Sequence, residues 1–266
     1  MLRYLHRKIG QWLARYLTEP LDSYHEFAAV NPALLRQCLK PCDILLVEGN
    51  SRISTAIKYL TQSTWSHACI YLGDDDERPL VEADLVEGVI RVSLEKYRDR
   101  NLRICRPVRL REDDAGQIVE FMRNRIGYTY DLKNITDLMR YLIQKPPVPD
   151  RFRRQLIELG SGDPTKAICS TLIAQAFQSI HYPILPREIS ICQGEQCSDS
   201  DTRILEARHY SNFTPRDFDL SPYFAVVKPT LERGFDYQRM RWLQDDDVPL
   251  PAPPAGTAID DRAQSA

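Results

Sequence analysis

The sequence lacks a long apolar run and an excess of charge of either sign. No stretch of about 18 uncharged apolar residues occurs in the 266 residues, which excludes an ordinary membrane-spanning helix. The formal net charge is −2, from 35 basic and 37 acidic residues, so no global basic surface attracts nucleic acid. Hydrophobic residues make up 43% and charged residues 27% of the chain, which is the balance of an ordinary globular protein.

The sequence also lacks the marks of a secreted disulfide scaffold. Its first residues show neither the continuous apolar core nor the small-residue cleavage site of a secretory signal. The seven cysteines are odd in number and scattered, whereas disulfide scaffolds are shorter, denser in cysteine and secreted. We therefore expect reduced thiols in a cytoplasmic protein. The sequence carries no signal for an oligomeric state.

Three segments of different character follow one another along the chain. Residues 1–40 hold a basic amphipathic helix, over about residues 1–18, and a linker. Such a helix docks either on the body of its own protein or on a membrane surface, so peripheral membrane contact stays open. Residues 41–230 form the main domain. Residues 231–266 form a C-terminal extension that turns to Asp, Pro and Ala without periodicity, and we expect it to be largely disordered from about 245.

The main domain is predicted to be α+β. Short apolar runs bounded by turn signals predict strands over 42–49, 67–73, 79–84, 88–94, 102–108 and 223–228. They form a small antiparallel sheet or a partly closed barrel. Helical periodicity marks 51–62, 112–127, 131–143, 150–158 and 167–180. A polar loop is expected from about 183 to 211.

Three polar side chains stand in otherwise apolar elements. Cys169 begins a strongly apolar helix, where the positive end of the helix dipole favours a thiolate. His67 is the one histidine of five on a predicted core strand, and imidazole is the natural partner of a nucleophilic thiol. Glu82 lies between Val81 and Ala83 on the next strand, where a carboxylate is costly to bury unless it is paired. Each also has a structural interpretation: a packing thiol, a satisfied core histidine and a solvent-facing acid.

The motifs "CDILLVEG", "WSHACIYLG", "VEA", "YD", "CSTLIAQAF", "TPRDF" and "SPYF", in this order, resemble the circularly permuted papain-like cysteine hydrolases of the NlpC-type superfamily, the YiiX/YaeF-like group. The resemblance implies a small antiparallel β-barrel or sheet packed against helices, with the nucleophile at a helix N-terminus. It implies Cys169 as nucleophile, His67 as base and Glu82 as the residue that orients the imidazole. Tyr130 matches a position near the pocket, where it either contacts substrate or packs on the core as an aromatic residue at a helix start. Trp65 and Ser66, at the mouth of the histidine strand, are also expected to contact substrate.

The expected activity is that of a thiol hydrolase that cleaves an amide or ester bond in a peptide- or lipid-type substrate through an acyl-enzyme. A lipid acyltransferase that uses the same site and a non-catalytic lipid- or membrane-binding module are the alternatives. No cofactor and no metal is expected. Cys192 and Cys197 in "CQGEQC" lack a second pair of ligands nearby, so they are interpreted as ordinary surface thiols.

Overall fold

The computed structural model describes residues 32–73, 77–129, 168–189 and 204–232, together with residues 16, 18, 19, 234, 236 and 238. Most of the expected N-terminal helix, the helices expected over 131–143 and 150–158, and most of the C-terminal extension lie outside this part of the chain. Contacts divide the chain into one unit over residues 1–233 and a second over 234–266.

The centre of the unit is a six-stranded antiparallel sheet in the order β4-β3-β2-β1-β5-β8. Its strands are β1 (Ile44–Val47), β2 (His67–Tyr71), β3 (Leu80–Asp84), β4 (Gly88–Val92), β5 (Leu102–Pro107) and β8 (Phe224–Val227). All six were expected from the short apolar runs of the sequence. Among the described strands the sheet is open, with β4 and β8 at its edges, so the barrel alternative is not formed there.

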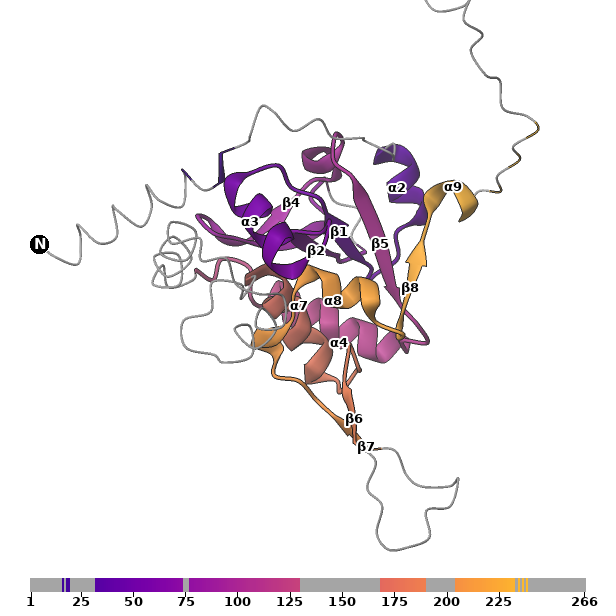
Figure 1. Cartoon of the computed structure of the whole chain (residues 1–266). Helices are drawn as coiled ribbons and strands as arrows, with labels where there is room; N and C mark the ends of the chain where they lie inside the picture. The colour runs from indigo at the N-terminus through magenta and orange to yellow at the C-terminus, as the bar shows by residue number, and fades with distance from the viewer. Residues whose placement is uncertain are drawn as a thin grey trace, which may run out of the picture. The chain divides into compact units, whose positions relative to one another are not determined.

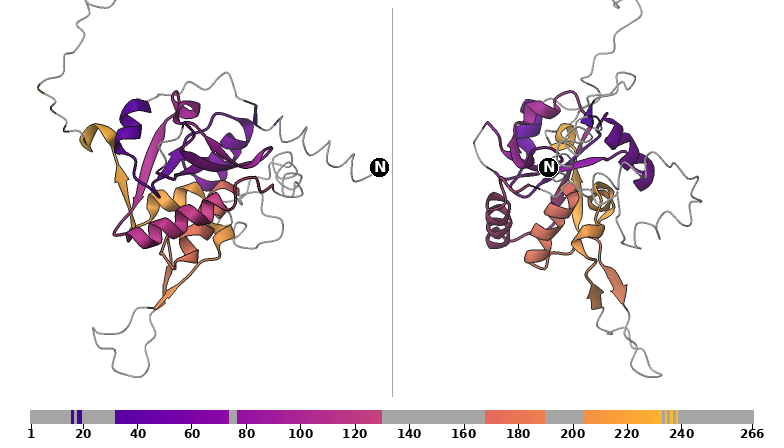
Figure 2. Two further views of the ribbon diagram at one scale, coloured as in Figure 1. Left: turned by 180° about the vertical axis from the view of Figure 1, so that it is seen from behind. Right: turned by 90° about the vertical axis from the view of Figure 1, so that its left-hand side faces the viewer.

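Successive side chains of a strand point to opposite faces of the sheet. Both faces are buried, because each packs against helices. One face carries Ile44, Ala68 and Ile70 and belongs to the core that includes α4 (Glu112–Arg123) and α7 (Ile168–Ser179). The other carries Leu45, Cys69 and the residues that pack against α2 (Pro32–Cys38) and the 3₁₀ helix η1 (Leu94–Tyr97). Figures 1 and 2 show α4 and α7 together below the sheet. The near-continuous apolar runs of β1 and β2 follow from this double burial.

Helices α3 and α8 begin at residues that cap them. Helix α3 (Arg52–Thr61) starts after Ser51, whose hydroxyl accepts a hydrogen bond from the Ser54 N–H at 3.2 Å. Helix α8 (Pro215–Leu220) starts with a reciprocal capping box between Thr214 and Asp217, which satisfies two N–H groups that a helix start leaves unpaired. The 3₁₀ helix η2 (Tyr210–Asn212) precedes α8, and α9 (Pro229–Glu232) follows β8. No helix in the described part of the chain is long and apolar enough to cross a bilayer.

Two features differ from the sequence expectation. The loop expected over 183–211 contains a hairpin of β6 (Arg187–Ile189) and β7 (Ile204–Glu206), visible in Figure 1 as a narrow extension beside α7. Strands of three residues are too short to give a periodic signal. The segment before residue 41 also contributes to the core, since Leu35 of α2 is fully buried against the sheet.

Candidate active site

The structure brings two of the expected site residues into direct contact. His67 opens β2, and Glu82 lies in the middle of the neighbouring strand β3. The His67 Nε2 and Glu82 Oε2 atoms are 3.1 Å apart. Helix α7, which carries Cys169 as its second residue, packs on both strands.

Glu82 is a buried carboxylate with four hydrogen-bond donors. The residue is 2% exposed, and its oxygens accept from His67, from the Cys69 thiol at 3.4 Å, and from the Lys96 ammonium and the Tyr97 hydroxyl of η1. The sequence analysis missed Lys96 and Tyr97. The solvent-facing alternative for Glu82 is wrong, because the register of β3 turns this side chain toward η1.

The donors decide the charge of Glu82. Burial alone would raise the pKa of the carboxyl group, but the hydrogen bonds and positive charges of His67 and Lys96 outweigh burial and lower the pKa well below its ordinary value. Glu82 is therefore ionised at neutral pH, and the site holds a fixed negative charge beside the imidazole.

His67 lies where two thiols and one carboxylate meet. Burial opposes its protonation, yet charge interactions and hydrogen bonding with the Cys169 and Cys69 side chains raise the pKa of His67 well above its ordinary value. Its side chain keeps 24% of its surface exposed. The imidazole thus contacts Glu82 and remains partly open to solvent.

Cys169 is held at the start of α7 by the residue that follows it. The Ser170 hydroxyl donates to the Phe213 carbonyl at 2.7 Å, which fixes the first turn of the helix against the segment before α8. Cys169 is 5% exposed and sits at the positive end of a 12-residue helix. These contacts place the thiol beside the histidine strand.

Cys42 and Cys105 are buried packing residues. All five described cysteines are free thiols. Burial, together with nearby negative charge, raises the pKa of both Cys42 and Cys105 to about 12, so both stay protonated and inert. Burial and the Glu82 charge also raise the pKa of Cys69. Cys169 differs from Cys42 and Cys105 in its position near the start of a helix that packs on the histidine strand.

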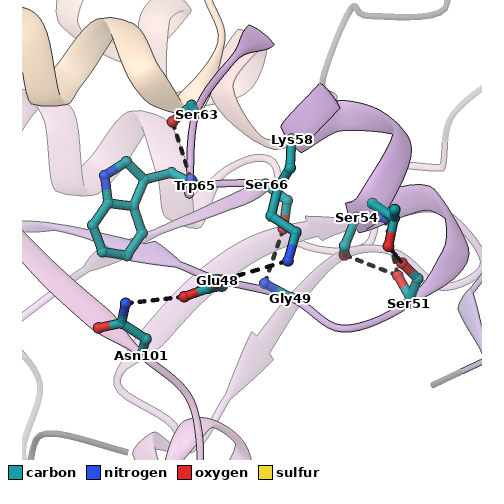
Figure 3. A network of polar contacts seen from close by, with 10 residues as sticks. Glu48, Gly49, Ser51, Ser54, Lys58, Ser63, Trp65, Ser66 and Asn101 are labelled. Carbon is teal, nitrogen blue, oxygen red and sulfur yellow. Dashed lines mark hydrogen bonds and ion pairs between the residues drawn. The ribbon is translucent and has the colours of Figure 1, made fainter. Parts of the chain in front are cut away.

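The expected substrate contacts have structural partners in the described chain. The buried Ser66 hydroxyl accepts from the Gly49 N–H at 3.0 Å, and Figure 3 shows this contact. The buried Trp65 indole donates to Asp219 Oδ2 at 3.1 Å, while the Arg103 guanidinium lies 4.9 Å from the centre of its ring. Both residues thereby fix the entry to β2. Their contact with substrate stays a prediction, and Tyr130 lies outside the described residues.

A polar network that the sequence analysis missed supports the same end of the sheet. The Glu48 carboxylate accepts from the Asn101 side-chain amide at 3.0 Å and pairs with Lys58 of α3 at 3.5 Å, as Figure 3 shows. Glu48 directly follows Val47, which is paired with His67 across β1 and β2. The network joins β1, α3 and the chain before β5 beside the histidine.

The donor atoms of three site residues are also close enough to share one metal ion. The His67 ring nitrogen, the Cys69 sulfur and a Glu82 oxygen all lie within 4.8 Å of one another.

Comparisons with known proteins find similarity in sequence and in structure. No family model matches the chain. The chain is 24% identical over 193 residues to the "Probable lipoprotein peptidase YaeF" of Escherichia coli (strain K12), which covers 66% of this chain and 67% of that protein. A crystal structure of the metalloprotein YiiX from Escherichia coli O157:H7 (DUF1105) aligns with a TM-score of 0.42 at 14% identity, over 71% of this chain and 96% of that one. The chain is thus similar to YaeF in sequence over two thirds of its length.

Proposed function

We propose that the protein is a cysteine hydrolase that cleaves an amide bond in a peptide- or lipid-type substrate. The observation that carries the proposal is the 3.1 Å contact between His67 Nε2 and the buried Glu82 carboxylate, on two strands against which the helix of Cys169 packs. A thiol, a base next to it and a group that orients the base together form the arrangement that activates a nucleophilic thiol. The similar protein YaeF is named a probable lipoprotein peptidase, and cleavage of a peptide bond agrees with this chemistry.

The proposed reaction runs through an acyl-enzyme. The Cys169 thiol passes its proton to His67 and the sulfur attacks the carbonyl carbon, while the N–H groups at the start of α7 supply positive potential for the developing oxyanion. His67 then gives its proton to the leaving nitrogen, and the C–N bond breaks. Water, deprotonated by the same imidazole, attacks the thioester, releases the acid and returns the proton to sulfur. Glu82 accepts a hydrogen bond from Nε2 throughout, which leaves Nδ1 for the proton transfers.

The order of the site residues supports a permuted papain-like arrangement as part of the proposal. The strand of His67 precedes the helix of Cys169 in the chain, the reverse of the papain order. The order agrees with the topology that the sequence motifs imply.

Mapping of alkylation by mass spectrometry tests the proposal without knowledge of the substrate. We expect iodoacetamide at pH 6 to modify Cys169 at least tenfold faster in the wild type than in His67→Asn, because the imidazolium stabilises the thiolate. Cys38, a partly exposed thiol outside the site, is the internal control and should react equally in both proteins. Equal rates at Cys169 in the two proteins would contradict the proposal.

A panel of N-acyl and peptidyl anilides then tests the activity itself. Cys169→Ala should abolish release of the aniline, and Cys38→Ala should leave it unchanged. Retained turnover in the Cys169→Ala protein would remove Cys169 as the nucleophile.

A further inference from the structure

The cluster of His67, Cys69 and Glu82 has a donor set that the hydrolytic proposal does not fully use. The acid and the histidine have roles in that proposal, but Cys69 has none. Its sulfur lies 3.4 Å from Glu82 Oε2, and the His67 Nε2 atom lies 3.1 Å from the same oxygen. We propose that these three side chains form a binding site for a thiophilic divalent cation, Zn²⁺ above all.

The distances between the donors suit a tetrahedral zinc ion. Bond lengths of roughly 2.0–2.1 Å to nitrogen, 2.0–2.2 Å to oxygen and 2.3 Å to sulfur place tetrahedral ligands about 3.3–3.7 Å apart. The sulfur–oxygen separation of 3.4 Å lies within this range, and the nitrogen–oxygen separation of 3.1 Å falls slightly short of it. All three donor atoms lie within 4.8 Å of one another. Small side-chain rotations therefore suffice to enclose the ion.

The chemistry of the donors favours zinc over magnesium or calcium. Imidazole and thiolate are ligands for zinc and other transition metals, whereas magnesium and calcium take oxygen ligands. A Zn²⁺ ion with one thiolate and one carboxylate has no net charge, which reduces the desolvation cost of burying the ion beside the apolar core. Lys96 and Tyr97 donate to Glu82 and would orient the ligating carboxylate from behind, as outer partners of metal ligands commonly do.

Three protein ligands leave the fourth tetrahedral position to water. His67 is the partly exposed member of the cluster, so the ion would enter from the histidine side. Cys69 and Glu82 are buried behind it.

Metal binding and thiol hydrolysis exclude one another at this site. Coordination displaces the Nε2 proton and the Cys69 thiol proton and removes the hydrogen bond between His67 and Glu82. In so far as the proposed hydrolase function holds, zinc is therefore an inhibitor of the enzyme. The binding site itself does not depend on that function.

Cobalt substitution tests the site with a readout other than activity. The metal-free full-length protein is titrated with Co²⁺, whose bond to a thiolate gives a strong charge-transfer absorption, and Zn²⁺ is then added in competition. We expect one ion per chain with sulfur ligation in the wild type, and at least a tenfold weaker affinity with loss of the charge-transfer band in Cys69→Ser. The serine keeps a hydroxyl donor for Glu82 but removes the soft ligand.

Matched variants separate this site from the other thiols of the chain. Cys38→Ser and the double variant Cys192→Ser/Cys197→Ser should bind the metal as the wild type does. Undiminished affinity in Cys69→Ser, or loss of binding in the double variant, would overturn the proposal.

X-ray absorption on the zinc-loaded wild type covers the case in which Cys69→Ser does not fold. A zinc shell with sulfur and imidazole nitrogen is expected, and a shell without sulfur would also overturn the proposal. The alkylation rate at Cys169 in metal-free protein reports separately on the hydrolase proposal.

Discussion

Replacement of Glu82 by glutamine removes the charge beside the imidazole and keeps the shape of the side chain. At the 3.1 Å separation of Nε2 and Oε2, two unit charges attract each other by about 5 kcal/mol at an effective dielectric constant of about 20. Desolvation of the buried pair offsets most of this energy. A net loss of about 1.5–3 kcal/mol for protonated His67 corresponds to a tenfold to hundredfold change. We therefore expect Glu82→Gln to slow alkylation of Cys169 at pH 6 by at least tenfold.

The same change should also destabilise the fold. A neutral amide with one acceptor oxygen and its own N–H₂ cannot satisfy the four donors that converge on Glu82. Breaking a buried ion pair costs about 3–5 kcal/mol, and Lys96, whose side chain is 41% exposed, regains part of this through hydration. We expect a loss of about 2–3 kcal/mol in the free energy of unfolding, measured by urea denaturation.

The pH dependence of this loss has a defined sign. The pKa of Glu82 is lowered in the folded protein, so its contribution is present above the ordinary value of 4.5 and disappears as the pH falls toward the folded value. The pKa of His67 is raised, so its contribution is complete below the ordinary value of 6.5 and disappears as the pH rises through the folded value. The stability difference between wild type and Glu82→Gln should therefore be greatest between pH 4.5 and 6.5.

Glu87→Gln is the matched control, since it makes the same chemical change at an exposed position in the turn after β3. It should leave both stability and alkylation unchanged. If Cys169 is alkylated as fast in Glu82→Gln as in this control, the Glu82 carboxylate does not act through the imidazole and is not part of the site.

Two further predictions concern the residues that hold the start of β2. Gly49→Ala should lower the free energy of unfolding by about 1–3 kcal/mol, because the added Cβ would overlap the Ser54 hydroxyl; an unchanged urea midpoint would show that this loop yields easily. Asp219→Ala should lower the free energy of unfolding by about 2–3 kcal/mol, because the Asp219 carboxylate accepts hydrogen bonds from the Trp65 indole at 3.1 Å and from Arg103 at 2.6 Å. Thermal denaturation measures the second effect, and a melting temperature equal to that of the wild type would contradict it.

The strands of the main sheet were predictable because burial on both faces leaves a local signal. Runs such as "ILLV" in β1 and "HACIY" in β2 are too short for helices and are bounded by turn residues. Polar residues inside such runs are conspicuous, and this marked His67 and Glu82 as candidates. The structure brings these two side chains together and packs the Cys169 helix against their strands. The catalytic roles of all three stay predictions.

The outer partners of the site were not predictable by the same means. Lys96 and Tyr97 belong to "LEKY", a single 3₁₀ turn among charged residues, which in sequence looks like any solvated connection. Their contact with Glu82 depends on which face of β3 the carboxylate occupies and on where η1 crosses that face. Both are properties of tertiary packing, and neither has a periodic signature.

The four donors around Glu82 also bear on the choice between an enzyme and a lipid-binding module. An acyl-chain pocket gains nothing from a buried carboxylate, because an apolar residue of similar size would avoid the desolvation cost and fill the space as well. Lys96 alone would satisfy Glu82 at the edge of the core, without a histidine or a tyrosine. The geometry instead places an ionised oxygen 3.1 Å from an imidazole, on a strand that packs against the helix of Cys169. Burial of a carboxylate that orients one ring nitrogen costs folding free energy, and such an arrangement is expected of a site that moves protons or binds a metal. Proton transfer and metal binding can both be measured at His67.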